Sequence, residues 1–290
     1  DYEGSRYRYD FWEGQGREYE DLAERIALRS LLPSSGDLLV EIGAGYGRLA
    51  DLYAGYQRVV LLDYARSQLE EAQQYLSDSD RFIFVVGDVY RLPFVDGLFD
   101  VLTMVRVMHH LVDVPRALTE LQRIIRSEGV AILEHASKQH LKSIARWLLR
   151  RQTWNPFDPQ PVEFVELNYD FHPGWMRQQL TEASFRVEKV RSVSHFRIPL
   201  LKKVLPPRWL ATWDALAQPT GQWWQLTPSV FVRAQAIKSS SGPPSGFFCC
   251  PVCRSVNLSP EGASLICENC GRQWRTEGGI YDFKTPLATP

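Results

Sequence analysis

The first 248 residues of this 290-residue chain contain no cysteine, because all five cysteines lie between Cys249 and Cys270. This clustering indicates one local site and excludes a disulfide framework spread along the chain. A long apolar run is also missing, since no stretch reaches the roughly 18 residues that a membrane-spanning helix needs. The N-terminal residues lack the apolar core of a signal peptide, so we expect a cytoplasmic protein, although a missing leader stays open because residue 1 is not Met.

The chain has no net charge of either sign to speak of, since 33 Lys and Arg residues stand against 34 Asp and Glu residues. This balance argues against a generally cationic nucleic-acid-binding protein but leaves local basic patches open. Hydrophobic residues make up 44% of the chain, which is enough for a sizeable core. The length allows one large domain and a small one. The sequence does not indicate an oligomeric state.

Short apolar segments alternate with amphipathic segments in the first half of the chain. Strands are predicted at 38–42, 58–65, 81–94, 99–107 and 129–136, and helices at 21–32, from Arg48, at 65–76 and at 114–125. Such alternation predicts a parallel sheet covered by helices on both faces. Segments 185–194 and 228–236 predict an antiparallel hairpin at one sheet edge. A Ser/Gly/Pro-rich linker at 238–246 divides a domain at 1–237 from a module at 247–290.

Three alternate glycines follow the first predicted strand in the segment "VEIGAGYG": Gly43, Gly45 and Gly47. Glycines at this place indicate that the backbone lies very close to a ligand. A phosphate-binding loop is excluded because no Lys follows the last glycine, and the spacing differs from the G-x-G-x-x-G of dinucleotide-binding proteins. The acid inside the strand, Glu41, suits a cationic ligand better than a pyrophosphate.

Four segments in this order resemble the class I S-adenosylmethionine-dependent methyltransferases: "VEIGAGYG", "LLDYARSQLEEA", "GDVYRLPFVDGLFDVLTMVRVMHHL" and "ELQRIIRSEGVAILEH". The resemblance covers about residues 20–136 well and residues 137–237 loosely. It implies an α/β fold with a doubly wound, mostly parallel, seven-stranded Rossmann-like sheet. One departure is Ser127-Glu128-Gly129, where the family often has Pro-Gly-Gly.

The resemblance also implies S-adenosyl-L-methionine as the cofactor and assigns residues to it. The loop of Gly43, Ala44 and Gly45 would lie against the methionine part of the cofactor, and Glu41 would face its ammonium. Asp63 would accept from the ribose hydroxyls. The adenine would contact the Tyr64 ring, the Asp88 carboxylate and the Val89 N–H, and Val105 is a further cofactor-binding candidate. Each acid taken alone also fits a helix cap or a solvated turn.

The end of the fourth predicted strand carries Arg106, His109 and His110, which the fold would place at the mouth of the cofactor site. They are the candidate catalytic residues, because a His titrates near neutral pH and can serve as a general base. A structural role for the His pair stays open. His135, Tyr169 and His172 are further candidates. The "DPPY"-type signature of enzymes that methylate amino groups on bases or glutamine is absent after this strand.

Seven of the nine Trp residues lie between Trp147 and Trp224, which suits a large apolar or planar acceptor or the packing of a lid. A predicted helix at 138–151 would carry Lys138, Lys142, Arg146 and Arg150 on one face. That face would meet RNA, anionic lipid, an anionic substrate or only solvent. We therefore expect methyl transfer to a small or lipid-like acceptor. The alternatives are an RNA methyltransferase and a non-catalytic cofactor-binding or partner-docking protein.

The cysteines form two Cys-x-x-Cys pairs, Cys250/Cys253 and Cys267/Cys270, separated by 13 residues. Four thiolates at this spacing predict a zinc site, whose binding would supply folding energy to a module with little core. Redox dithiols or disulfides are the alternative. Cys249 belongs to neither pair, and we expect it to take no part in the site. The run "CPVC…CENCGRQWRTEGGIYDF" resembles the small zinc-ribbon proteins that activate tRNA, rRNA and release-factor methyltransferases by docking on them.

Overall fold

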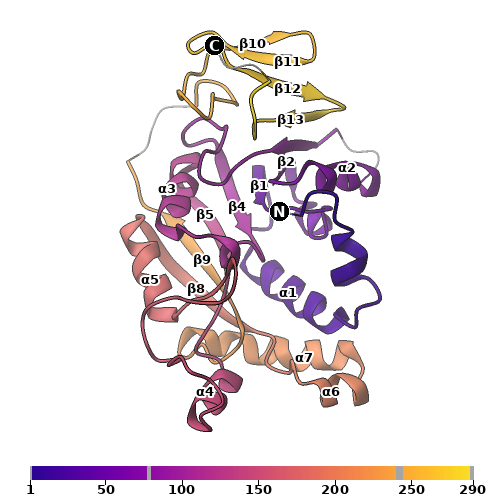
Figure 1. The fold of residues 1–290 in the computed structure, drawn as a ribbon, viewed down its shortest axis with the longest axis vertical. Coiled ribbons are helices and arrows are strands. Elements are labelled where there is room, and N and C mark those ends of the chain that lie inside the picture. The colour runs from indigo at the N-terminus through magenta and orange to yellow at the C-terminus, as the bar shows by residue number, and fades with distance from the viewer. Residues whose placement is uncertain (1, 77–79, 240–243, 288–290) are drawn as a thin grey trace.

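The computed structural model describes residues 2–76, 80–239 and 244–287, and its main feature is one eleven-stranded sheet (Figure 1). Its parallel centre has the order β3-β2-β1-β4-β5. These strands are β1 Gly36–Ile42, β2 Tyr56–Asp63, β3 Phe82–Val86, β4 Phe99–Met104 and β5 Ile125–Ala136. All five predicted strands are therefore confirmed, with β3 and β4 shorter than their apolar segments.

Helices cover both faces of this sheet, as the alternation of apolar segments predicts. Along β1, Leu38, Val40 and Ile42 belong to one buried cluster and Leu39 to the other, because successive side chains of a strand point to opposite faces. The first cluster also contains residues of α3 Val114–Ile124 and α5 Pro173–Glu182. The second contains residues of α1 Glu18–Leu31, α2 Arg66–Tyr75 and α7 Pro207–Ala217.

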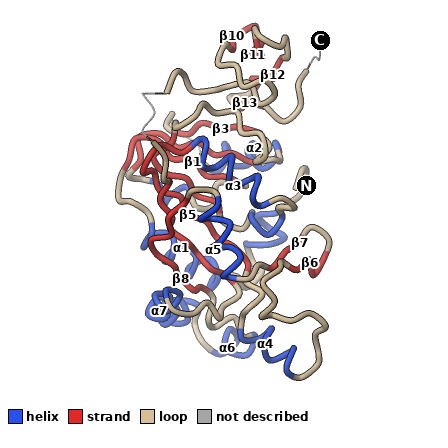
Figure 2. The backbone as a smooth tube through the Cα atoms, turned by 90° about the vertical axis from the view of Figure 1, so that its left-hand side faces the viewer, coloured by secondary structure: helices blue, strands red, loops and turns tan. Residues whose placement is uncertain are grey.

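The predicted antiparallel strand pair is present at one sheet edge, but it is not a hairpin, because residues 194–228 and their helices separate the two strands. It consists of β8 Phe185–Val193 and β9 Ser229–Ala236, and β9 pairs with β5 in the antiparallel sense. The segment between β5 and β9 adds α4 Leu141–Leu148, the short hairpin of β6 Val162–Val165 and β7 Asn168–Asp170, and α6 Pro199–Val204. Figure 2 shows α4, α6 and α7 together at one end of the molecule. No helix among the described residues has both the length and the apolar character to span a membrane.

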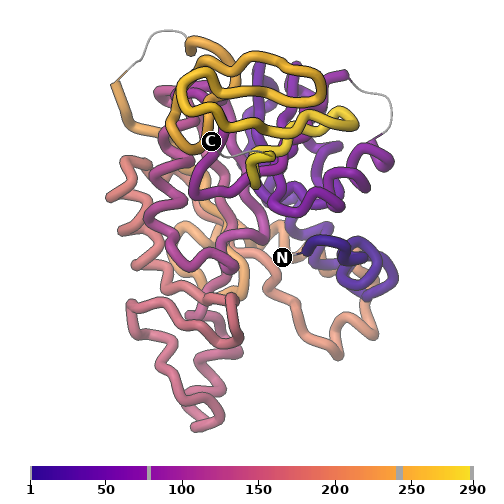
Figure 3. The backbone as a smooth tube through the Cα atoms, turned by 45° about the horizontal axis from the view of Figure 1, so that its top comes forward, coloured from indigo at the N-terminus to yellow at the C-terminus, as the bar shows by residue number. Residues whose placement is uncertain are grey.

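The C-terminal module extends the sheet beyond the seven strands of the domain. Its strands are β10 Leu258–Glu261, β11 Ser264–Cys267, β12 Gln273–Glu277 and β13 Ile280–Asp282. β13 pairs in parallel with β3, with Tyr281 opposite Val85. Figure 3 shows the module lying across this end of the molecule. The module thereby covers a sheet edge that would otherwise expose unpaired backbone groups.

Two predicted helices are shorter in the structure. The helix expected from Arg48 is only a 3-10 turn at Ala50–Tyr53, because β2 begins three residues later at Tyr56. The basic helix expected at 138–151 is limited to α4. His140 caps its start by accepting from Ser143 N at 3.2 Å, and Arg150 lies beyond its end with a φ of 53°. Lys138 precedes α4, is buried, and donates from Nζ to Gln160 O at 2.6 Å.

Candidate cofactor site, acceptor cavity and cysteine cluster

The carboxylate of Glu41 is buried at the carboxyl end of β1. Its side chain is 3% exposed, and Oε2 has no hydrogen-bond partner. Burial raises the pKa of Glu41 to about 8, although nearby Arg48 and a hydrogen bond from Tyr53 oppose this rise. An unpartnered buried acceptor is costly unless a ligand supplies the missing donor. The arrangement therefore fits a ligand that carries a cationic N–H group.

The three glycines after β1 have different structural roles. A Cβ on Gly43 would lie 2.0 Å from Val107 Cγ2, and a Cβ on Gly47 would lie 2.9 Å from Leu76 Cδ1. A Cβ on Gly45 would meet no atom within 4 Å, although its φ is +54°. Gly43 and Gly47 are therefore required by neighbouring side chains. Gly45 instead borders open space next to the backbone, as a loop that holds a ligand requires.

Asp63 ends β2 and is joined to this loop. Its Oδ2 accepts from Gly45 N at 2.8 Å and its Oδ1 from Ala65 N at 2.9 Å. Burial raises its pKa, whereas these backbone N–H groups act in the opposite direction. Ala44, which is 5% exposed, donates from its backbone N to Leu62 O at 3.0 Å. The glycine loop is thus fixed to the end of the neighbouring strand.

The residues predicted to contact the cofactor's adenine, together with Val105, lie just after the ends of β2, β3 and β4. Gly87 N donates to Asp63 O at 3.0 Å, which brings the segment after β3 beside the end of β2. Asp88 Oδ1 already accepts from Tyr90 N at 2.9 Å, and its Oδ2 lies 3.3 Å from Arg91 Nη2. Val89 is partly buried and Val105 is 6% exposed, whereas Tyr64 is 48% exposed. The Lys284 ammonium, from the module, lies 3.8 Å from the centre of the Tyr64 ring.

The three predicted catalytic residues have different surroundings. Arg106 has a φ of 59°, and its Nε donates to Glu24 Oε1 at 2.8 Å. His109 lines the large cavity described below, and burial lowers its pKa to about 3, with the His110 ring and the Arg106 cation acting in the same direction. His110 contacts Leu167 O through Nδ1 at 3.0 Å. His109 is therefore neutral near pH 7, and Arg106 is held by an acid from α1.

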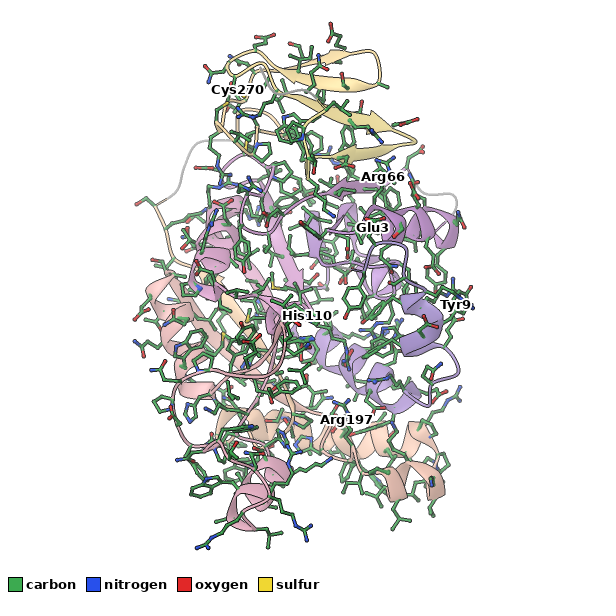
Figure 4. All side chains as sticks on the ribbon, viewed as in Figure 1. Glu3, Tyr9, Arg66, His110, Arg197 and Cys270 are labelled. Atoms are coloured by element: carbon green, nitrogen blue, oxygen red, sulfur yellow. The ribbon has the colours of Figure 1, made fainter. Side chains whose placement is uncertain are left out.

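The N-terminal segment covers this region, which sequence reasoning did not predict. Glu3 accepts from the backbone N–H groups of Arg66 and Ser67 at 2.9 and 3.0 Å, and Figure 4 shows Glu3 and Arg66 beside each other. Tyr2 OH lies 3.4 Å from His110 Nε2. The Trp12 ring faces the guanidinium of Arg48 at 3.8 Å and that of Arg106 at 4.9 Å. The sequence signal for this contact is the high content of aromatic residues and arginine in residues 6–12.

A cavity of about 1820 Å³ opens beside His109 and Arg106 and reaches α4. Typical small-molecule sites measure roughly 300–1,000 Å³, so this one can hold a large ligand. Asp170 lines it, and burial raises the pKa of Asp170 to about 6. No pattern in the sequence singled out Asp170. The other predicted candidates do not line the cavity: His135 is buried against Phe171, and His172 caps α5 by accepting from Gly174 N at 3.1 Å.

The four predicted metal-ligating cysteines come together in the module. The sulfur atoms of Cys250, Cys253, Cys267 and Cys270 all lie within 4.8 Å of one another. Sγ of Cys250 lies 3.7 Å from that of Cys270, and Sγ of Cys253 lies 3.4 Å from that of Cys267. A tetrahedral zinc with bonds of about 2.3 Å separates its ligands by roughly 3.8 Å, so these thiols fit such an ion. All five thiols are free, so no disulfide competes for them.

The two cysteine turns have the same backbone form. Arg254 N donates to Cys250 O at 2.9 Å, and Gly271 N donates to Cys267 O at 2.8 Å. Both residues directly follow the second cysteine of their pair and have a positive φ, 64° and 68°. Glycine adopts this conformation readily, whereas Arg254 adopts it at a cost. Arg254 is also held by Glu120 of α3, whose Oε1 accepts from Nη2 at 2.6 Å.

Cys249 does not belong to the cluster but to the contact between module and domain. Its backbone N donates to Pro93 O at 2.9 Å, and its buried Sγ lies 3.1 Å from Phe94 O. The Phe248 ring packs on Phe94, Tyr281 and Phe283. The module therefore shares a core with the domain, although the sequence suggested a separate unit after a linker. Residues 240–243 of that linker lie outside the described residues.

Part of the chain is similar to known proteins. Residues 40–133 match the family described as a methyltransferase domain. The 27-O-demethylrifamycin SV methyltransferase of Amycolatopsis mediterranei is 28% identical over 134 residues, which are 43% of this chain and 49% of that protein. The demethylmenaquinone methyltransferase of Clavibacter sepedonicus is 31% identical over 106 residues, 36% of this chain and 43% of that protein. The chain thus spans about half the length of these relatives.

Solved structures share the fold at low identity. A complex of the Haloferax volcanii Trm112 methyltransferase activator with a candidate methyltransferase matches with a TM-score of 0.54 and 19% identity, over 78% of this chain and 95% of that chain. The [4+2]-cyclase SpnF matches with a TM-score of 0.53 and 16% identity, over 79% and 87%. Because a cyclase shares the fold, the fold alone does not establish the reaction. Residues 40–133 are therefore similar to a methyltransferase-domain family, and the chain has the Rossmann-like fold that these solved methyltransferase structures share.

Proposed function

We propose that this protein is an S-adenosylmethionine-dependent methyltransferase that acts on a small or lipid-like organic acceptor. The observation that carries this proposal is the buried, unpartnered Oε2 of Glu41 beside the open space at Gly45. A carboxylate in this position can accept from the cofactor's ammonium. Asp63, at the end of the neighbouring strand, would accept from the ribose hydroxyls.

The bound cofactor would supply an electrophilic methyl group on a sulfonium. The chain's own contribution is alignment and shelter, because methyl transfer of this kind is an in-line displacement. The glycine loop and Asp63 would fix the donor end, and the segment with Tyr2 and Trp12 would limit access of water. Acceptor and cofactor would meet near His109, where the large cavity borders the end of β4.

Proton removal from the acceptor is best assigned to Asp170 among the acids of the cavity. Its pKa, raised to about 6 by burial, leaves it ionised at neutral pH yet more basic than an ordinary Asp. Glu134, the other cavity acid, already accepts hydrogen bonds from Ser229 Oγ at 2.7 Å and from Arg106 N at 2.9 Å. Neutral His109 has a low pKa and is a weak base.

An organic acceptor is favoured over RNA by the arrangement of the chain. The module and α4, the two elements an RNA-binding surface would use, lie at opposite ends of the molecule (Figure 1). The cavity, by contrast, lies within the domain and is lined by Arg106 and His109, which follow β4. The relatives named for rifamycin SV and menaquinone precursors act on organic molecules. We assign zinc to Cys250, Cys253, Cys267 and Cys270, with a structural role.

Calorimetry on the full chain tests the proposal. S-adenosylmethionine and its demethylated product should bind at micromolar or better affinity, while NAD should not compete. Asp63→Ala should lose at least about tenfold in affinity, since it removes a charged acceptor of hydrogen bonds. Glu166→Ala, an exposed acid of the β6–β7 turn, is the matched control and should bind as the wild type does. The assignment would be wrong if NAD bound more tightly than S-adenosylmethionine, or if Asp63→Ala kept the wild-type affinity for S-adenosylmethionine.

A further inference from the structure

Cationic side chains dominate the polar wall of the large cavity. Arg106 is neutralised by Glu24, but six further cations line the wall against the two acids Glu134 and Asp170. They are Arg17, Lys142, Arg146, Arg150, Arg151 and Arg197. Within residues 2–76, 80–239 and 244–287, only Arg197 of these six has a carboxylate oxygen within 4.0 Å, namely Glu20 Oε1 at 3.6 Å. The cavity therefore holds uncompensated positive charge.

Arg17 lies near Arg106, whose charge acts on it. Four of the other cations lie in α4 or directly after it, at the end of the molecule opposite the module (Figure 1): Lys142, Arg146, Arg150 and Arg151. Arg146 provides the sharpest observation, because its Nε is buried without a hydrogen-bond partner. A buried donor of this kind is costly and calls for an acceptor that the protein does not provide. The charges of Arg146, Lys142 and Arg197 all act on the ring of His140, the residue that caps α4. Together with burial, they lower the pKa of His140 to about 4.

About half of the uncharged residues of the wall are apolar or aromatic, and the other half are polar. Leu141 and Ile198 line the cavity and are 64% and 49% exposed, so they also form part of its opening. Trp154 and Phe196 line it as partly buried residues, and Trp224 lines it with 58% of its surface exposed. These apolar and aromatic residues suit an apolar body, while the arginines suit an anionic group, since guanidinium binds carboxylate and phosphate oxygens in a bidentate manner.

We propose that the cavity binds an amphipathic anion, whose carboxylate or phosphate lies on Arg146 and Lys142 and whose apolar body extends toward His109. The anionic group would supply the acceptor that Arg146 Nε lacks. The methyl-accepting atom would then lie at the end of the ligand remote from the charge, beside the cofactor. This inference rests on the proposed function, because it assigns the class of acceptor to the same site.

Binding of simple amphiphiles tests the inference without requiring turnover. Dodecyl phosphate, laurate and the neutral dodecanol would be titrated below their aggregation concentrations, with calorimetry or the fluorescence of the cavity tryptophans as readout. We expect at least one anion to bind tenfold or more tightly than dodecanol. The phosphate and carboxylate arms show which anionic group the site prefers. Equal affinity of all three would overturn the inference.

Two variants and one control locate the anion. Arg146→Gln should abolish the preference for the anion and leave dodecanol binding unchanged. Lys142→Gln, at an exposed position, should reduce the preference for the anion about threefold. It tests the site even if Arg146→Gln folds poorly. Arg208→Gln, on the exposed surface of α7, should retain the full preference. A preference that survives both cavity variants, or an RNA oligonucleotide that binds more tightly than either anion, contradicts the inference.

Cofactor binding, measured on the same samples, separates the two proposals. Anion preference without affinity for S-adenosylmethionine would refute the proposed function but leave the anion site intact. Affinity for the cofactor without anion preference would refute only the anion site. Loss of cofactor affinity in Arg146→Gln would show that this residue acts on the cofactor and not on an acceptor, which also contradicts the inference.

Discussion

The Lys284 ammonium lies 3.8 Å from the centre of the Tyr64 ring, so the C-terminal module contacts the rim of the candidate cofactor site. A second contact joins the same regions, since Arg66 at the start of α2 donates from Nη2 to Glu277 O at 3.0 Å. The backbone N of Arg66 in turn donates to Glu3 at 2.9 Å. The module, α2 and the N-terminal segment thus support one another beside the site.

Loss of the metal should therefore lower the affinity for the cofactor. We expect one zinc per chain, and Cys250→Ser should lose it together with thermal stability, because the metal organises the module. Loosening the Lys284 contact should lower cofactor affinity about two- to fivefold, since an exposed cation–π contact contributes roughly 0.5–1 kcal/mol. Elemental analysis and calorimetry measure both effects. Cys249→Ser, one residue away but outside the cluster, should retain the zinc.

Two glycines two residues apart should respond differently to the same change. Gly43→Ala would place a Cβ 2.0 Å from Val107 Cγ2 at a φ of +74°, so the fold should be destabilised by several kcal/mol. Gly45→Ala meets no atom within 4 Å, and its backbone strain costs about 1–2 kcal/mol. Its Cβ would enter the space assigned to the cofactor, so affinity should fall by about tenfold or more. Thermal unfolding and calorimetry separate the two outcomes, and unchanged affinity in Gly45→Ala would exclude this placement.

The sequence predicted the parts of the site that are local in the chain. The glycine loop, Asp63 and the cysteine pairs each lie within a short segment whose spacing indicates their role, and the structure brings each group together. The sequence did not indicate that Glu24, 82 residues away from Arg106, accepts hydrogen bonds from the Arg106 guanidinium. Nor could it show that burial would leave His109 neutral. Both depend on packing between distant segments, which no local pattern encodes.

The docking of the module on β3 also could not be predicted from the sequence. A Ser/Gly/Pro linker indicates a flexible connection and says nothing of where the module comes to rest. The contact depends on the free edge of β3, on the Phe248 ring and on the ion pair of Arg254 with Glu120. The same limit applies to the cavity, because Lys142 and Arg146 line it together with Arg197, which lies 51 residues after Arg146 in the chain.

Glu41→Gln should stabilise the protein in the absence of cofactor. Burial raises the folded-state pKa of Glu41 from an ordinary value of 4.5 to about 8. As the pH rises through this window, the unfolded chain loses the proton first, so this group makes folding progressively less favourable. The amide removes that cost, and the variant should melt at a higher temperature than the wild type at pH 8 but not at pH 4. Its cofactor affinity should nevertheless fall, and a variant that melts lower at pH 8 would contradict the assignment.

Arg106→Met should mainly damage the fold. Glu24 is 1% exposed, and the Arg106 and Arg48 cations lower its pKa although burial opposes this. Removing one partner of a buried pair costs about 3–5 kcal/mol, because the remaining charge is left without full compensation. Denaturant unfolding at pH 7 should show this loss, reduced somewhat by Arg48. The double variant Arg106→Met/Glu24→Gln should recover part of it, which a purely catalytic role of Arg106 does not predict.

His109 should remain neutral throughout the physiological range. Burial, the His110 ring and the Arg106 cation together lower its pKa to about 3. Because a His with a lowered pKa is not protonated above that value, its ring nuclei should show no titration between pH 5 and pH 8 in an NMR experiment. His109→Gln identifies the signal and should leave the melting temperature nearly unchanged, since the amide retains polar atoms at the cavity wall. A His109 signal that titrates near pH 6.5 would show that solvent or a counter-charge reaches the ring, and would restore His109 as the general base in place of Asp170.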